Sequence, residues 1–177
     1  MRRVMVAAGA FLFISVWALG PRALWAQGSF ELVTGKAFDQ ALPKDFYLEG
    51  NAIPTQKRNA ALLKTPAGAR LLLALLDTSG YSSQVQEKYL GMAIIEGPVS
   101  ICGQALAVGS YGFGLKKTAG ESNEPAEFFV YNQAGDKVAQ CSANKDTQLE
   151  HPRPLEVFPK GASAQWYLGR YLMEIRP

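Results

Sequence analysis

Short apolar segments separated by turn-forming residues recur along this 177-residue chain, and their spacing is the strongest constraint on its fold. Two pairs of such segments flank Thr65-Pro66-Ala67-Gly68 and Ala134-Gly135-Asp136. Proline presets one backbone dihedral of a tight turn and glycine accepts a positive one, so both links favour hairpins. Strand-like segments joined by such links predict antiparallel β-structure.

Two segments indicate how strands are buried. Leu71 to Leu76 is continuously apolar, which is typical of a strand buried on both faces, although its periodicity also permits a helix. Tyr111, Phe113 and Leu115 alternate with small or polar residues, and we expect this aromatic face to point inward. Gly112 and Gly114 on the opposite face predict a bulge or a close approach of two backbones.

Helix is scarce in the pattern: Lys36 to Leu42 and Ser82 to Tyr89 are the two short candidates. The polar run Asn51 to Asn59 and the segment Thr78 to Gln86 are expected to be long loops, and Trp166 to Ile175 a single final strand. About eight to ten short strands with one or two short helices predict an all-β domain. We favour a single antiparallel β-sandwich, with a small β-barrel as the alternative.

The N-terminus has the three parts of a secretory signal peptide. Arg2 and Arg3 precede the apolar run Val4 to Leu19, and the small residue Ala26 stands at a candidate cleavage site. We therefore expect residues 1–26 to be a signal helix used by the general secretory route, and residues 27–177 to be a single β-rich domain. The protein would then be periplasmic or extracellular, and would meet the membrane only through this segment. An uncleaved anchor or an earlier cut after Ala18 are the alternatives.

Removal of this segment changes the charge. The whole chain has 18 basic and 15 acidic side chains, and three of the basic ones, Arg2, Arg3 and Arg22, belong to residues 1–26. The remaining chain is neutral, so its total charge favours neither nucleic acid nor an anionic membrane as a partner. Local pairs such as Lys57-Arg58 and Lys116-Lys117 are interpreted as solvated faces.

The chain has two cysteines, Cys102 and Cys141. In an oxidising compartment such a pair favours a disulfide, which would contribute about 2–4 kcal/mol to stability in the chain-entropy model. Two buried thiols are the alternative. Two cysteines and the single histidine, His151, are too few for structural zinc, and we expect neither a metal nor a cofactor.

Asp77-Thr78-Ser79-Gly80 follows the apolar segment Leu71 to Leu76. Over about ten residues this resembles the strand and Asp-Thr-Gly turn that carry the catalytic aspartate of aspartic proteases. The match departs at Ser79, where a glycine should follow Thr78. The resemblance makes Asp77 a candidate catalytic residue; the alternative is a simple turn closed by side-chain hydrogen bonds.

Other enzyme classes have weaker support. A serine hydrolase needs a histidine base, and His151 lies between Glu150 and Pro152 in a proline-rich segment. A glycosidase based on a carboxylate pair stays open, because the spatial separation of Asp and Glu is invisible in the sequence. We therefore assign no residue a catalytic role.

Trp166, Tyr167 and Tyr171 gather near the C-terminus and could form an exposed aromatic platform for a ligand; the alternative is that they belong to the core. These observations favour a non-enzymatic periplasmic or extracellular binding module with an unknown protein or carbohydrate as partner. A hydrolase is one alternative. A small barrel that carries an apolar, lipid-like ligand is the other.

Overall fold

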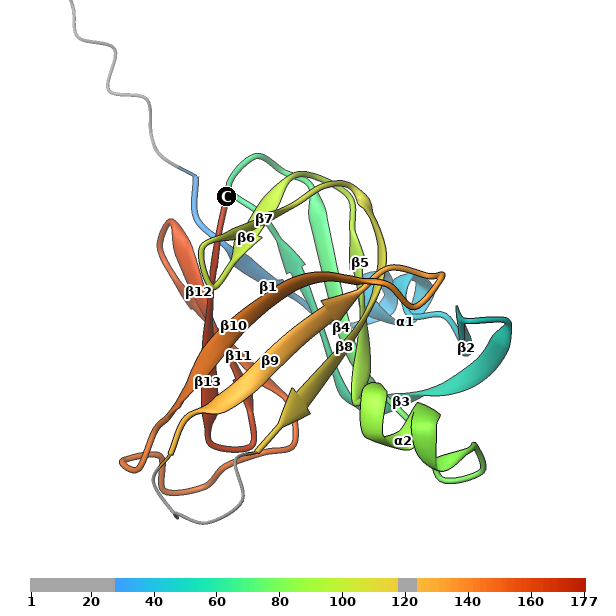
Figure 1. The fold of residues 1–177 in the computed structure, drawn as a ribbon. Helices are drawn as coiled ribbons and strands as arrows, with labels where there is room; N and C mark the ends of the chain where they lie inside the picture. The colour runs from blue at the N-terminus through green and yellow to red at the C-terminus, as the bar shows by residue number, and fades with distance from the viewer. Residues whose placement is uncertain (1–27, 118–123) are drawn as a thin grey trace, which may run out of the picture.

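A computed structural model describes residues 28–117 and 124–177, so the expected signal peptide and most of the expected loop 118–125 lie outside the described residues. One continuous antiparallel path of strands forms most of the molecule (Figure 1). Its spatial order is β1 (Glu31–Val33), β3 (Asn51–Lys64), β4 (Arg70–Leu76), β5 (Gly91–Ile95), β8 (Gly109–Lys116), β9 (Ala126–Tyr131), β10 (Lys137–Lys145), β13 (Tyr171–Arg176), β12 (Ser163–Leu168) and β11 (Glu156–Lys160). The all-β prediction is confirmed.

The path curls until its last strand lies beside its first. At one end of this junction the backbone N–H of Phe30 donates to the carbonyl oxygen of Gly161 at 2.8 Å. In the described part of the chain no ladder of paired residues joins β11 to β1 or β3. The result is a nearly closed barrel in which side chains from facing strands pack together in the interior, as in a β-sandwich. One seam, between β11 on one side and β1 and β3 on the other, has no strand pairing in the described residues.

The remaining elements lie outside this path. β2 (Asp45–Leu48) pairs with the start of β3, and β6 (Val99–Ile101) pairs with β13 and with β7 (Gln104–Leu106). The two short helices are α1 (Lys36–Ala41) and α2 (Ser83–Lys88), close to their predicted positions. The hydroxyl of Ser82 caps α2 by accepting from the backbone N–H of Val85. Neither helix is long and apolar enough to cross a membrane, a finding limited to the described residues.

β4 is buried on both faces, as its continuous apolar sequence predicts. Leu71, Leu73 and Leu75 point into the barrel, where they pack with Phe113, Phe128 and Trp166. The alternate residues Leu72, Ala74 and Leu76 point outward into a second cluster. This outer cluster also contains side chains of β2 and α2, and α1 packs against its margin. The wall formed by β3, β4 and β5 therefore has hydrophobic layers on both sides.

The prediction of a loop over Asn51–Asn59 is wrong, because these residues are the first nine of the 14-residue strand β3. Glu49 and Gly50 have φ values of 47° and 77°, which is the backbone of a type I′ hairpin turn between β2 and β3. Ile53 is fully buried while its neighbours are more exposed. A register shift between Gln56 and Ala60 then bends the strand. The polar composition hid a half-exposed strand.

The prediction of a single strand over Trp166–Ile175 is also wrong. It divides into β12 and β13, which pair with each other in the register Leu168↔Tyr171. The turn lies at Gly169-Arg170, and Gly169 has a φ of 61°, which is favourable for glycine. Trp166 and Tyr171 therefore lie on two strands rather than one.

The predicted close backbone approach at the glycines of β8 is confirmed. A Cβ atom on Gly112 would lie 2.7 Å from the ring of Tyr89, and one on Gly114 would collide with the carbonyl oxygen of Lys88. The end of α2 and Tyr89 therefore pack directly on the backbone of β8. The absence of side chains at these positions is what allows α2 to lie against the barrel.

The predicted disulfide joins Cys102 and Cys141, whose Cα atoms are 6.1 Å apart. Cys102 occupies the turn between β6 and β7, and Cys141 lies on β10. The bond therefore fastens the small β6–β7 hairpin to the barrel wall. Among the described residues there is no free cysteine.

We predict that Gly114→Ala destabilises the protein by about 1–3 kcal/mol, because its Cβ would force α2 away from β8. Urea unfolding measures the change. Gly80→Ala is the matched control, since a Cβ there meets nothing within 4 Å. Equal stability of the two variants would contradict the close approach.

We predict that Cys102→Ser, Cys141→Ser and the double variant each lose about 2–4 kcal/mol of unfolding free energy, because each breaks the same bond. The equality of the three losses is the internal control. If the double variant lost twice as much as either single one, the two cysteines would stabilise the fold independently and the bond would be refuted.

Candidate functional site

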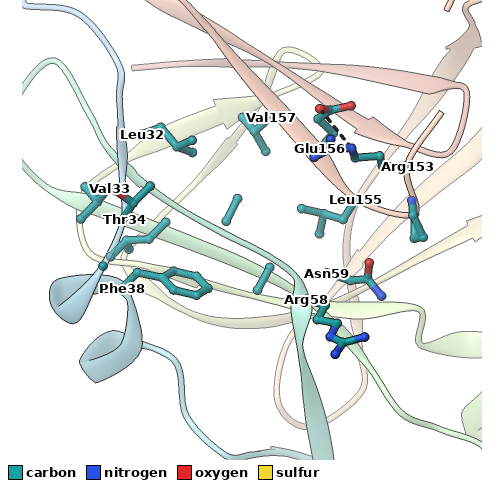
Figure 2. Close-up of a pocket in the computed structure, with 15 residues that line it drawn as sticks. Leu32, Val33, Thr34, Phe38, Arg58, Asn59, Arg153, Leu155, Glu156 and Val157 are labelled. Carbon is teal, nitrogen blue, oxygen red and sulfur yellow. Dashed lines mark ion pairs between the residues drawn. The ribbon is translucent and has the colours of Figure 1, made fainter. Parts of the chain in front are cut away.

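The unpaired seam of the barrel opens into a cleft of about 300 Å³. β1 and α1 form one side, β3 forms the floor, and β11 with the segment before it forms the other side (Figure 2). Much of its lining is apolar and comes from Leu32, Val33, Phe38, Leu62, Leu155 and Val157. This volume is at the lower limit of small-ligand pockets, which are typically about 300–1,000 Å³.

Part of the apolar lining stays exposed because no strand covers it, whereas Leu62, Leu155 and Val157 are buried. Leu32 is 50% exposed although it is a large hydrophobic residue. Val33 and Phe38 pack only partly against the outer hydrophobic cluster. Removal of such apolar surface from water contributes about 25 cal/mol per Å², so a ligand that covers it would gain free energy.

Polar side chains occupy one end of the cleft. Figure 2 shows Arg58, Asn59 and Arg153 at the end opposite Phe38 and Leu32. Asn59 donates to the side-chain oxygen of Gln56 at 2.7 Å. Arg153 forms a long ion pair with Glu156, with 3.8 Å between Nε and Oε1. The side chain of Arg58 has no hydrogen-bond or ion-pair partner among the described residues.

A second hollow adjoins the cleft at Arg153 and Pro154, which line both. Its volume is about 450 Å³, and Tyr171 is part of its wall. The ammonium group of Lys117 lies 5.9 Å from the centre of the Tyr171 ring. Arg170 in the same wall donates to the carbonyl oxygen of Leu149.

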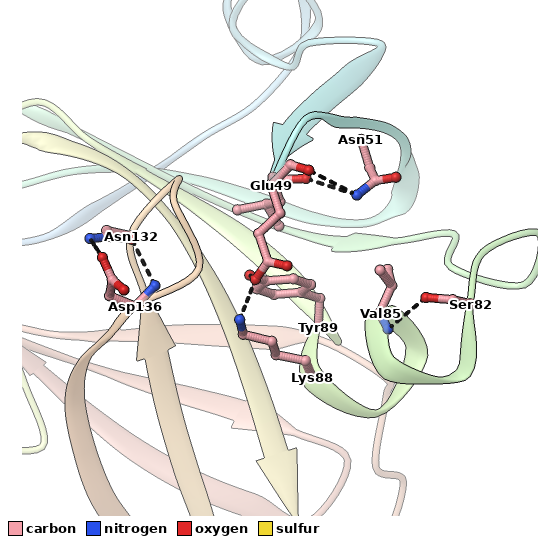
Figure 3. Close-up of polar contacts among 9 residues, drawn as sticks. Glu49, Asn51, Ser82, Val85, Lys88, Tyr89, Asn132 and Asp136 are labelled. Atoms are coloured by element: carbon pink, nitrogen blue, oxygen red, sulfur yellow. Dashed lines mark hydrogen bonds and ion pairs between the residues drawn. The ribbon is translucent and has the colours of Figure 1, made fainter.

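A different polar cluster lies on the outer layer of the barrel (Figure 3). The carboxylate of Glu49 accepts from the ammonium group of Lys88 and, at 2.6 Å, from the hydroxyl of Tyr89. The backbone N–H of Glu49 donates to the carbonyl oxygen of Gln133 at 2.9 Å. Lys88 also lies over the rings of Tyr89 and Tyr131, at 5.2 and 5.0 Å from their centres. The cluster joins the β2–β3 turn, α2 and the β9–β10 hairpin.

The pKa shifts in this cluster are those expected of a structural contact. The hydrogen bond from Lys88, followed by that from Tyr89, holds the pKa of Glu49 below its ordinary value. Burial, reinforced by the Glu49 carboxylate, raises the pKa of Tyr89. Both groups are thus fixed in their ordinary neutral-pH forms, Glu49 charged and Tyr89 protonated. That assignment suits fastening of the outer layer rather than proton transfer.

Asp77 lies on an exposed turn after β4. Its carboxylate accepts from the hydroxyl of Ser79 at 2.7 Å and from the backbone N–H of Ser79 at 3.2 Å. These bonds lower the pKa of Asp77. A protease dyad instead needs two carboxyl groups that share a proton, which raises one of the two pKa values. The contacts of Asp77 are those of a turn closed by its own side chain.

The three aromatic candidates do not form one exposed platform. Trp166 is fully buried and its ring meets those of Phe113 and Phe128 edge to face, with centres 4.8 and 5.1 Å apart. Tyr167 is also buried and its hydroxyl donates to Asp146 at 3.0 Å. Tyr171, which is less buried, lines the second hollow. The core interpretation therefore holds for Trp166 and Tyr167.

The residues of the cleft had no signal in the sequence. They come from β1, α1, β3 and the segment 153–157, which are far apart in the chain. Of the Lys57-Arg58 pair, Lys57 forms an ion pair with Asp39 at 2.8 Å and only Arg58 lines the cleft. His151 is exposed. Within residues 28–117 and 124–177, no group of three His, Cys, Asp or Glu side chains could hold a metal ion.

Comparison of the chain with models of known families, with curated proteins and with solved structures finds no match.

We predict that Glu49→Gln lowers the free energy of unfolding by about 1 kcal/mol at neutral pH, because it removes the charge that Lys88 and Tyr89 bind. The folded-state pKa is depressed, so this contribution is present above the unfolded pKa of about 4.5 and is lost as the pH falls through the folded pKa. Urea unfolding of both proteins from pH 7 to pH 3 should show the curves converging in acid.

Glu87→Gln is the matched control, because Glu87 lies on the exposed side of the same helix. It should follow the wild-type curve at every pH. A Glu49→Gln variant as stable as wild type at pH 7 would show that the cluster does not fasten the outer layer.

Proposed function

We propose that this chain is an exported, non-enzymatic binding protein that works in the periplasm or outside the cell, and that the seam cleft holds the apolar part of its ligand. The N-terminal pattern supports export, and the disulfide is compatible with an oxidising compartment. The observation that carries the binding site is the exposed part of the apolar lining, at Leu32, Val33 and Phe38, beside the unpaired strand edges. Large apolar side chains gathered in a concave site are typical of ligand pockets.

The cleft suits an apolar small molecule better than the other partners considered. Sugar recognition favours an exposed aromatic face, whereas Phe38, the one aromatic residue of the cleft lining, is partly buried against the outer cluster. A protein strand would need two inter-strand spacings, about 9.5 Å, between the edges. Cα atoms of β3 and β11 approach within 8 Å, which leaves no room for a third strand there.

The ligand space lies at the seam rather than inside the barrel. The interior is occupied by core side chains, among them Trp166, Phe113 and Met173, each at most 1% exposed. A carrier of the lipocalin kind, with its ligand enclosed by the strands, would need that volume to be empty. The proposed protein therefore binds its ligand between strand edges, on the surface of a filled barrel.

We predict that Ala60→Leu weakens binding of the uncharged fluorescent dye N-phenylnaphthylamine about tenfold, because the added carbons occupy the cleft. Fluorescence titration of the purified protein gives the affinity, and thermal unfolding verifies that the variant is folded. Thr34→Phe makes the same test at an exposed position of the cleft lining.

Ala105→Leu is the matched control, since Ala105 is exposed on β7 and does not line the cleft. It should bind the dye like wild type. Failure of wild type to bind, or unchanged binding by both cleft variants, would reject the seam as the binding site.

A further inference from the structure

We propose that the ligand of the seam cleft is a free monoanionic amphiphile, with a short apolar body in the cleft and its carboxylate between Arg58 and Arg153. This inference rests on the proposed function and adds the chemical class of the ligand. It is carried by the separation of apolar and cationic side chains along the cleft.

The two ends of the cleft differ in chemistry. Leu32, Val33 and Phe38 lie at the end formed by β1 and α1 (Figure 2). Arg58 and Arg153 lie at the other end, on opposite sides of the opening. The guanidinium group of Arg58 points outward, so this exposed side chain must turn to reach a carboxylate bound beside Arg153. A ligand that matches both ends must have an apolar body and a negatively charged head.

The charge of the cleft differs from that of the chain without its expected signal segment. Residues 27–177 carry equal numbers of basic and acidic side chains. The cleft lining has two arginines and a single acidic residue, Glu156. One positive charge is therefore left uncompensated at the polar end of the cleft.

Arg58 differs from its charged neighbours because its side chain has no partner in the described part of the chain. Lys57, one residue earlier, forms a close ion pair with Asp39. The guanidinium plane of arginine presents paired N–H donors that match the two oxygens of a carboxylate. Arg58 can offer this complete donor set to a ligand.

Arg153 also retains donors for a ligand. Its contact with Glu156 is long, at 3.8 Å, and involves Nε. The side chain of Arg153 is 74% exposed, so the pair is weakly held. An incoming carboxylate could use the terminal nitrogens of Arg153, which this contact with Glu156 does not occupy.

The volume limits the size of the apolar body. A cleft of about 300 Å³ equals the space of roughly ten water molecules at about 30 Å³ each. The part of a ligand that the cleft encloses therefore has roughly ten non-hydrogen atoms, and a larger molecule such as the dye extends out of the opening. A free medium-chain acid fits this limit, and decanoate is a suitable probe.

The test compares three probes of equal chain length: decanoate, decanol and decyltrimethylammonium. Each displaces N-phenylnaphthylamine from the purified protein, and the affinities follow from the loss of fluorescence. We expect decanoate to bind about tenfold more tightly than decanol and the cationic probe to bind most weakly. Raising the salt concentration should weaken the binding of decanoate and leave the binding of decanol unchanged.

Arg58→Gln should weaken the affinity for decanoate about threefold. The double variant Arg58→Gln with Arg153→Gln should bind decanoate only as tightly as decanol. Lys57→Gln removes the same charge one residue away, outside the cleft lining, and should preserve the preference for decanoate. Decanol affinity should be the same in all these variants, which shows that the apolar part of the cleft is intact.

The outcomes separate the two proposals. If none of the probes binds, the proposed function fails and this inference fails with it. If decanol and decanoate bind wild type equally, the apolar cleft stands but the carboxylate site is refuted. Equal loss of decanoate preference in Lys57→Gln and Arg58→Gln would also refute it. The protein could also sediment with phosphatidylglycerol vesicles and be released from them by decanoate. That result would overturn the proposal of a free acid and indicate a membrane lipid as the ligand.

Discussion

Burial of β4 on both faces links the two hydrophobic layers of this protein. Its leucines alternate between the barrel interior and the outer cluster, and complete burial of each contributes about 1.5–3 kcal/mol. β3 and β5 must lie on either side of β4 to complete that wall. β2, α1 and α2 must then cover its outer face, which explains the direct packing of Tyr89 and Lys88 on the glycines of β8.

The same wall leaves the seam open. β2 pairs with residues 51–54 of β3 and β1 pairs with residues 62–64, so the edge between them has no strand partner in the described residues. β11 approaches this gap from the other side and carries Pro159, which has no N–H to donate. Pairing is therefore weak at the point where the barrel would close. Leu32 at this gap therefore stays exposed, and Val33 and Phe38 are only partly buried.

The sequence predicted what depends on local periodicity and turn chemistry. The leucine run, the alternation at Phe113 and the hairpin turn at Gly68 all appear as expected, because each is determined by neighbouring residues. The first half of β3 was missed because a half-exposed strand can be as polar as a loop. The seam cleft could not be predicted, since Phe38, Arg58 and Val157 meet only when the last strand returns to the first.

Backbone amide shifts of isotope-labelled protein, followed during titration with N-phenylnaphthylamine, test the binding site most directly. Occupation of the seam predicts that the largest changes fall on β1, α1, residues 58–62 and residues 153–157. The β6–β7 hairpin, on which no lining residue of the cleft lies, should stay unchanged. Changes centred on another surface, with the seam amides unaffected at saturating dye, would contradict the account.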